Sequence, residues 1–225
     1  MQSLITPVAR IITDFDEKFG VPRQSGRVKT ALGKIIFEPE FRAEDALRGI
    51  EQYSHLWLIF GFSLTEDKPF SPLVRPPRLG GNEKVGVFAS RSPNRPNRLG
   101  LSVVKLEGVK NSPQGKILLV SGVDLVSGTP IYDVKPYLPD YDCVTEAKGG
   151  FSSDCKDYRL TVELDCAVPE NFPQDKIETL KNCLADDPRP SYHKSGREYG
   201  MKFCGFNVKF RSDNGALVVT EITEL

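Results

Sequence analysis

The sequence predicts a mainly β protein, α+β overall, in which a β-barrel or sandwich is followed by a small α+β unit. Short β-branched or aromatic runs, often bounded by Gly, Pro, Asn or Asp, fill the first two thirds of the 225 residues. A polar stretch without periodicity follows near residue 140, and the remainder combines one amphipathic helix pattern with further strand patterns. Many short strands with few helices argue against an alternating β-α-β sheet.

Seven segments of the first part are expected to form strands, and one segment is expected to form a helix. The run HLWLIFGF is apolar nearly throughout, which predicts a strand buried on both faces. In FRAEDALRGIEQY the apolar residues recur at i, i+3, i+4 and i+7, which predicts a helix over 41–53. The expected strands are 7–12, 34–38, 55–62, 85–89, 101–108, 116–123 and 129–134.

The C-terminal part begins with a linker. The stretch LPDYDCVTEAKGGFSSDCKD, residues 138–157, has almost no periodicity. A strand is expected over 158–167, and a helix is expected in PQDKIETLKNCLADDP, which Pro173 and Pro188 bracket. Asn214-Gly215 predicts a final hairpin. We therefore expect two domains, 1–142 and 143–225.

Composition excludes several classes of protein. Thirty basic and thirty acidic residues cancel, so nucleic-acid binding has to depend on a local patch. No signal peptide and no apolar run long enough for a membrane span is evident, which predicts a cytoplasmic protein without membrane contact. Five cysteines without a C-x-x-C pair predict reduced thiols, and with only two histidines no metal site is expected.

Positive charge gathers in one part of this neutral chain. Residues 75–98 hold six basic side chains and one acid, mostly within the loops SPLVRPPRLGGN and SRSPNRPNRLG. Proline fixes the backbone, so arginines beside it are displayed from a stiff frame that suits phosphates or carboxylates. A solvated turn with surface arginines is the alternative. The similar stretch FGVPRQSGRVKT places Arg23 and Gln24 directly after Pro22.

Polar residues also follow the expected strand 116–123. Asp124 ends this apparently buried strand, and Asp133, Lys135 and Tyr137 alternate along the next one, so these three share a face. They could line a pocket or form a solvent face. No catalytic-triad order, P-loop or dinucleotide fingerprint is present.

Five blocks occur in the order typical of one family: VPRQ, SHLWLIF, RPPRLGG, GVFASRSPNRPNRLGLS and DLVSGTPIYDVKPYLP. Over residues 5–140 the chain resembles the TsaA-like, or TrmO-type, methyltransferases, and DDPRPSY is similar to the C-terminal extension of bacterial members. The family usually has proline where this chain has Arg98. The resemblance implies a single-sheet N-terminal β-barrel that binds S-adenosylmethionine, a homodimer, and methylation of N6 of N6-threonylcarbamoyladenosine at position 37, beside the tRNA anticodon.

The resemblance also implies which residues form the site. The cofactor set comprises Arg23, Gln24, Ser25, Phe62, Ser63, Arg91, Leu101, Ser121, Gly122, Val123 and Asp124. The local positive charge, and not the resemblance, motivates the further hypothesis that Arg95 and Arg98 contact phosphates of the anticodon loop. The candidate substrate-binding residues are Arg95, Asn97, Arg98 and Lys135. An arginine suits the cofactor carboxylate, and an acid suits the region near its sulfonium.

The acceptor nitrogen belongs to a urea-like group, so a general base would assist its attack. Asp124 and Asp133 are the candidates, with Tyr137 or Lys135 to orient the urea. Two rival interpretations stay open at this point: a non-catalytic RNA-binding module, and the same barrel methylating another acceptor. Basic and aromatic residues within DDPRPSYHKSGREYG favour tRNA.

Overall fold

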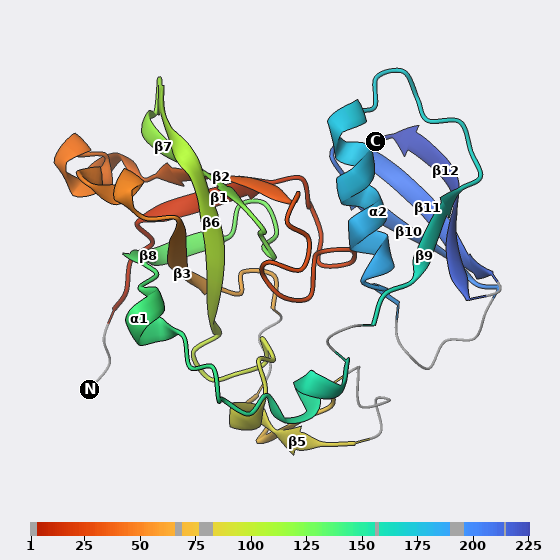
Figure 1. The fold of residues 1–225 in the computed structure, drawn as a ribbon, viewed down its shortest axis with the longest axis horizontal. Helices are drawn as coiled ribbons and strands as arrows, with labels where there is room; N and C mark the ends of the chain where they lie inside the picture. The colour runs from red at the N-terminus through yellow and green to blue at the C-terminus, as the bar shows by residue number, and fades with distance from the viewer. Residues whose placement is uncertain (1–3, 66–68, 77–82, 156–157, 190–195, 214) are drawn as a thin grey trace.

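The first part of the chain forms a closed barrel, shown in Figure 1 beside a separate four-stranded sheet. The computed structural model describes residues 4–65, 69–76, 83–155, 158–189, 196–213 and 215–225. Every pair of neighbouring barrel strands is antiparallel, and β1 closes the ring by pairing with β8. In ring order the strands are β1 (Ala9–Thr13), β2 (Leu32–Phe37), β7 (Gly115–Ser121), β6 (Leu99–Ser112), β3 (His55–Gly61) and β8 (Pro130–Pro136). The mainly β prediction is confirmed.

The barrel interior is filled by alternate residues of its strands. On β3 the side chains of Leu56, Leu58 and Phe60 are buried, whereas the residues between them are half-exposed. The prediction that this strand is buried on both faces is therefore wrong, because a barrel covers only the inward face of each strand. Gly100 on β6 lies opposite Phe60, and a Cβ there would come within 2.2 Å of the Phe60 ring.

The predicted helix over 41–53 is wrong. The segment instead forms three short 3₁₀ turns, Pro39–Phe41, Glu44–Leu47 and Ile50–Gln52. Arg48 is extended and Gly49 has a φ of 88°, so the helical path is broken between Leu47 and Ile50. The apolar spacing reflects how these turns lie on the barrel, where Leu47 and Ile50 pack against the core.

The predicted strand over 85–89 is only partly confirmed. β5 (Val85–Gly86) pairs with β4 (Leu73–Val74), and a 3₁₀ turn, Val87–Ala89, follows directly. Val87 is buried and Phe88 is exposed, so the apolar run turns instead of continuing as a strand. The expected linker contains a short helix, α1 (Pro139–Asp142), and a 3₁₀ segment, Gly150–Cys155.

The C-terminal part is a four-stranded sheet with one helix. The sheet order is β10-β11-β12-β9, with β9 parallel to β12 and the other pairs antiparallel. A strand is present within the expected range 158–167, although it is shorter. The expected helix is also present, after a 3₁₀ turn, Gln174–Lys176, whereas no sequence pattern predicted β10. The bounds are β9 (Thr161–Leu164), α2 (Ile177–Ala185), β10 (Glu198–Phe203), β11 (Phe206–Asp213) and β12 (Ala216–Glu224).

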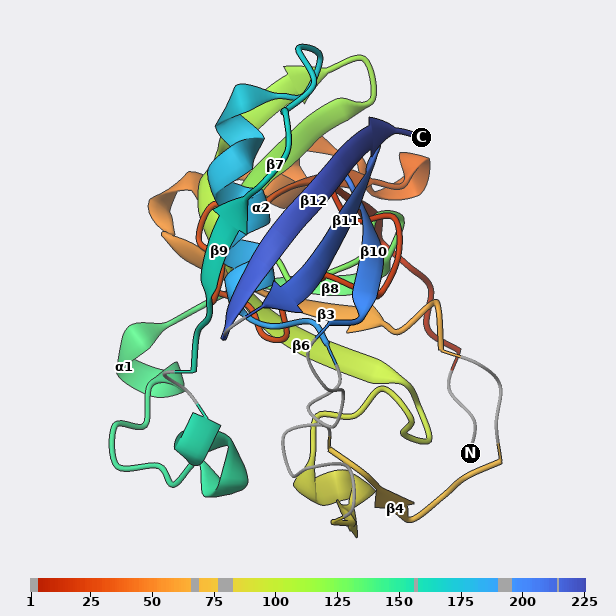
Figure 2. The same cartoon turned by 90° about the vertical axis from the view of Figure 1, so that its right-hand side faces the viewer.

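The connection between β1 and β2, residues 14–31, joins the barrel to this sheet. Figure 1 shows it reaching from the barrel toward α2, and Figure 2 shows the sheet and α2 in front of the barrel. The Phe15 ring lies 5.6 Å from the Phe203 ring, and the Phe19 ring stacks on those of Tyr199 and Phe210. The buried apolar residues of both parts consequently form one cluster.

Candidate functional site at one end of the barrel

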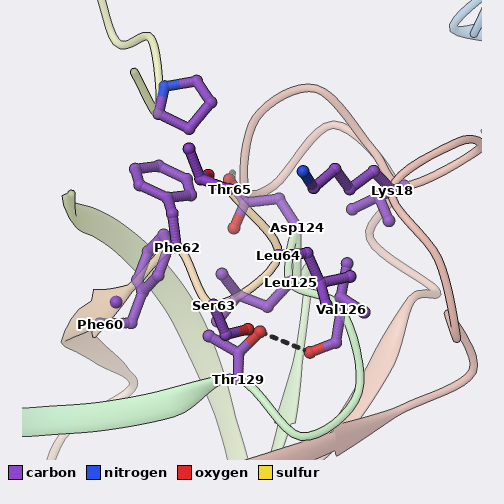
Figure 3. Close-up of a pocket in the computed structure, with 13 residues that line it drawn as sticks. Lys18, Phe60, Phe62, Ser63, Leu64, Thr65, Asp124, Leu125, Val126 and Thr129 are labelled. Carbon is purple, nitrogen blue, oxygen red and sulfur yellow. Dashed lines mark hydrogen bonds between the residues drawn. The ribbon is translucent and has the colours of Figure 1, made fainter. Parts of the chain in front are cut away.

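A pocket of about 220 Å³ opens where β3 and β7 end. Its walls are mostly apolar, and Figure 3 shows Asp124 and Lys18 among the side chains that surround it. Sites for drug-sized ligands have volumes of roughly 300–1,000 Å³, so this pocket suits one portion of a ligand whose remainder lies at the mouth. The lining residues are Lys18, Val21, Phe60, Gly61, Phe62, Ser63, Leu64, Thr65, Pro93, Asp124, Leu125, Val126 and Thr129.

Asp124 is the acid of this pocket. Its Oδ1 accepts a hydrogen bond from the Ser102 hydroxyl at 2.8 Å. Burial raises the pKa of Asp124 to about 6, while hydrogen bonds from Ser102 and from the Ser25 backbone, and the positive charge of Arg91, act in the lowering direction. A carboxyl with a pKa near 6 is largely ionised at neutral pH and still able to accept a proton, which is the property a general base needs.

Two glycines bring the β1–β2 connection against the end of β7. The Gly26 N–H donates to the Gly122 carbonyl at 2.8 Å, and the Val123 N–H donates to the Ala31 carbonyl at 3.3 Å. Gly122 has a φ of 74°, and a Cβ on it would lie 3.3 Å from the backbone of Gly26. This close crossing is what holds the Ser25 N–H beside the Asp124 carboxylate.

Arg23 and Gln24, which precede this crossing, form hydrogen bonds with other parts of the protein. Arg91 Nη1 donates to Gln24 Oε1 at 2.6 Å, which ties the central basic loop to the β1–β2 connection. The Arg23 guanidinium donates to the Asp187 carbonyl and, at 3.2 Å, to the Arg189 carbonyl. Arg23 therefore holds the segment that follows α2, and it does not line the pocket.

The basic loop of residues 90–98 forms one side of the pocket mouth, where Pro93 lines the wall. The Arg95 guanidinium donates to the Ser90 carbonyl at 3.1 Å, so this side chain organises its own loop. Arg98 has a φ of 48°, and its carbonyl accepts the Phe62 N–H at 2.9 Å. The family usually has proline at this position, and proline cannot adopt a positive φ. The arginine of this chain therefore permits a left-handed backbone that the usual residue would not. Asn97 is exposed.

The second group of predicted residues lies elsewhere, on the outward face of the barrel. Asp133 pairs with Lys135 at 2.8 Å, and the Tyr137 ring lies 5.7 Å from the Trp57 ring. The pairing of β3 with β8 shifts in register between Asp133 and Ile131. Because of this shift, Asp133 points outward although Ile131, two residues earlier, is buried in the barrel. The structure thus brings Asp124 to the pocket and leaves Asp133, Lys135 and Tyr137 outside it.

Four further predicted cofactor residues have different positions. Phe62 and Ser63 line the pocket. Leu101 is 52% exposed on the outward face of β6, and it is not a lining residue. The Ser121 hydroxyl donates to Glu107, a hydrogen bond that lowers the pKa of Glu107, so only the backbone of Ser121 is available toward Gly122.

The site residues that the sequence did not indicate include Ser102, which donates to the pocket acid, and the lining residues Lys18 and Thr65. Ser102 is a polar residue at an inward-facing position of a strand, and that alternation could have revealed it. Lys18 and Thr65 carried no recognisable signal. The Thr65 Oγ1 atom is buried and has no hydrogen-bond partner among the described residues, so the pocket offers an unused polar group to a ligand.

Several predicted features lie outside the described residues. They include Arg78 with most of RPPRLGG, the end of DDPRPSY, His193, Lys194 and Asn214. Within the described ranges, no group of three or more His, Cys, Asp or Glu side chains is arranged to hold a metal ion. No helix there is long and apolar enough to cross a membrane.

The fold and the site define a β-barrel with an apolar pocket that contains a buried acid, and comparison with known proteins specifies the family. The model of the tRNA-methyltransferase O N-terminal domain matches residues 10–143, and that of the TrmO C-terminal domain matches residues 159–225. The chain belongs to this family, which confirms the resemblance seen in the sequence.

Individual relatives agree with this assignment. A tRNA (adenine(37)-N6)-methyltransferase from Escherichia coli (strain K12) is 39% identical over 211 residues, which is 89% of each chain. A putative S-adenosylmethionine-dependent methyltransferase from Pseudomonas aeruginosa is 41% identical over 92% of each chain. The crystal structure of TrmO from P. aeruginosa matches with a TM-score of 0.80 and 32% identity, covering 100% of this chain and 98% of that one.

Proposed function

We propose that the protein transfers a methyl group from S-adenosylmethionine to N6 of N6-threonylcarbamoyladenosine at position 37 of tRNA. Family membership supports this function, as does the similarity to the E. coli relative, a tRNA (adenine(37)-N6)-methyltransferase. The observation that carries the proposal is the pocket itself, in which apolar walls converge on an acid whose pKa is about 6.

The residues of the pocket fit such a ligand. The apolar side chains of Phe60, Phe62 and Leu125 offer surface to an adenine or to the methylthio portion, and the Thr65 hydroxyl offers a hydrogen bond. The Asp124 carboxylate is the group suited to a nearby positive sulfur. When bound, S-adenosylmethionine supplies an activated methyl group.

We assign Asp124 as the general base. At neutral pH its carboxylate accepts the proton of the acceptor N–H as that nitrogen attacks, and Ser102 holds the carboxylate in place. Asp133 is the weaker candidate because Lys135 neutralises it on the outward face of β8. Positioning of the two reactants supplies the rest of the acceleration.

For the tRNA, we propose that Arg98 and Asn97 meet the phosphates of the anticodon loop at the mouth of the pocket. Arg95 acts on tRNA indirectly, because its guanidinium holds the loop that displays its neighbours. Lys135 lies on the outward face, so a contact from it requires the RNA, or a second subunit, to extend over β8. We also propose a homodimer, a cytoplasmic location, and the two domains 1–142 and 143–225.

The deciding experiment is methyl transfer from labelled S-adenosylmethionine to two tRNA preparations, one carrying threonylcarbamoyladenosine and one lacking it. We expect label only in the first. Label in neither, despite cofactor binding, would direct the search to another acceptor. Absence of cofactor binding as well would make a non-catalytic RNA-binding module the better interpretation.

A further inference from the structure

Lys18 stands out among the pocket residues because the proposed reaction has not yet used it. It lies on the β1–β2 connection and lines the pocket. Figure 3 shows its ammonium group directed toward the side where Asp124 and Thr65 lie. Among the described residues, Lys18 forms no ion pair with Asp124 or with any other acid.

The C-terminal sheet fixes the backbone on both sides of Lys18. The Lys202 N–H donates to the Glu17 side chain at 2.9 Å, immediately before Lys18. The Phe19 ring, immediately after it, stacks on Tyr199 and Phe210 at centroid distances of 6.1 Å. The ammonium group is therefore carried by an anchored backbone, although the side chain itself is exposed.

The pocket holds a cation and an acid that do not form an ion pair with each other. They are therefore complementary to a ligand that carries both an anionic group and a positive or hydrogen-bond-donating group. The carboxylate of Asp124 suits a positive sulfur or an N–H donor, and the ammonium of Lys18 suits an anion. Lys18 would repel a sulfonium, so the anionic end of the ligand is the part that belongs beside it.

We propose that Lys18 forms a carboxylate-binding subsite at the mouth of this pocket. The inference depends on the proposed function, which supplies two ligands of this chemistry. S-adenosylmethionine carries a carboxylate on its methionyl portion, and threonylcarbamoyladenosine carries one on its threonyl portion. Binding either of them orients the ligand with its reacting atoms toward Asp124.

The test compares Lys18→Gln and Lys18→Arg with Lys29→Gln in the full-length protein. Lys29 is an exposed lysine on the same connection and does not line the pocket, so Lys29→Gln controls for the loss of one positive charge. One arm measures the Kd of S-adenosylmethionine and of its decarboxylated analogue. The other arm measures KM for tRNA carrying threonylcarbamoyladenosine as the free acid or as its methyl ester.

Lys18→Gln is expected to weaken the binding of one of the two carboxylate-bearing ligands by about 10- to 100-fold, which corresponds to the loss of a hydrogen bond to a charged group. It is also expected to abolish the preference for that acid over its neutral analogue, whereas Lys18→Arg retains most of it. The affected arm identifies which carboxylate is bound.

Equal behaviour of Lys18→Gln and Lys29→Gln in both arms would overturn the assignment of Lys18. This result is distinguishable from a failure of the proposed function, because wild-type protein would then still bind the cofactor and methylate tRNA. Wild-type protein that did neither would refute the function, and the subsite with it. A thermal melt of each variant verifies that the fold is kept.

Discussion

At the scale of single residues, the site depends on a balance of forces on one carboxyl group. Burial of Asp124 favours its protonated form, whereas the Ser102 hydroxyl, the Ser25 N–H and the charge of Arg91 favour the ionised form. Because burial has the larger effect, the pKa lies at about 6, close to the working range of a base. Asp133, paired with Lys135 on the outer surface, experiences no such burial.

We predict that Asp124→Asn lowers kcat by about 10²- to 10⁴-fold, the usual contribution of a general base, while Asp133→Asn stays close to wild type. Only the ionised carboxylate accepts a proton, so the wild-type rate should fall as the pH drops through about 6. Single-turnover methyl transfer measured over a range of pH tests this. Equal activity of both variants would exclude Asp124 as the base.

The same substitution should stabilise the fold. The folded-state pKa of Asp124 is about 6, above its ordinary value of 3.8, so ionisation is less favourable in the folded than in the unfolded chain. Folding is therefore opposed at pH 7, by up to about 3 kcal/mol, and this opposition disappears as the pH falls toward 4. Asp124→Asn should accordingly raise Tm at pH 7 and leave it nearly unchanged at pH 4.

At the scale of elements, the close crossing of the β1–β2 connection over the end of β7 decides where the acid and its partners meet. Gly122 makes this crossing possible, since it supplies both a left-handed backbone and space for Gly26. The connection then places the Ser25 N–H at Asp124. A change at Gly122 should therefore reach the pocket through the backbone.

We predict that Gly122→Ala weakens cofactor binding and shifts the pH profile of the reaction, because its Cβ would push Gly26 and Ser25 away from Asp124. Gly128→Ala is the matched control, since Gly128 also has a positive φ, 81°, but no atom within 4 Å of the added Cβ. Both variants should lose about 1–2 kcal/mol of stability from backbone strain. Only Gly122→Ala should change the pH profile, and identical profiles would contradict the proposed link.

The elements whose buried residues recur at a regular period could be predicted from the sequence. The prediction failed where the backbone conformation interrupts that period. Strands β1, β2, β3, β6, β7 and β8 were expected within a few residues. The apolar residues at 47 and 50 fit a helix, but extended Arg48 and left-handed Gly49 interrupt it. Along β8, alternation alone could not reveal the register shift that turns Asp133 outward.

The candidate site was predictable to a similar degree. Sequence blocks indicated Phe62, Ser63 and Asp124, and these residues do line one pocket. Lys18 lines the pocket on a segment whose neighbouring residues, Glu17 and Phe19, contact the C-terminal sheet. Such a long-range contact leaves no local pattern in the chain, so neither spacing nor composition could have identified it.

At the scale of the whole molecule, the C-terminal part of the chain supports the pocket of the barrel. Lys176 pairs with Asp14 at 2.7 Å with both side chains largely buried, and the Thr179 hydroxyl donates to the Thr30 carbonyl at 3.2 Å. Together with the shared apolar cluster, these contacts fix both ends of the β1–β2 connection. The C-terminal part thus shapes the site in addition to any contact it makes with tRNA.

We therefore predict that the barrel and the C-terminal sheet unfold as one unit. Phe203→Ala removes a fully buried ring from β10 that contacts Phe15, and it should lower the stability by about 3–5 kcal/mol. Trp57, the sole tryptophan, lies on barrel strand β3, so its fluorescence reports barrel unfolding alone. The Trp57 melting midpoint should fall by on the order of 10 °C.

Phe88→Ala is the control for this experiment, because the Phe88 side chain is 75% exposed and its loss should change the stability by less than about 0.5 kcal/mol. Far-UV circular dichroism, which follows both sheets, should melt together with the Trp57 signal in every variant. If Phe203→Ala instead produced an early transition by circular dichroism with the Trp57 midpoint unchanged, the two parts would fold independently. The anchoring of Lys18 by the C-terminal sheet would then contribute nothing to the stability of the barrel.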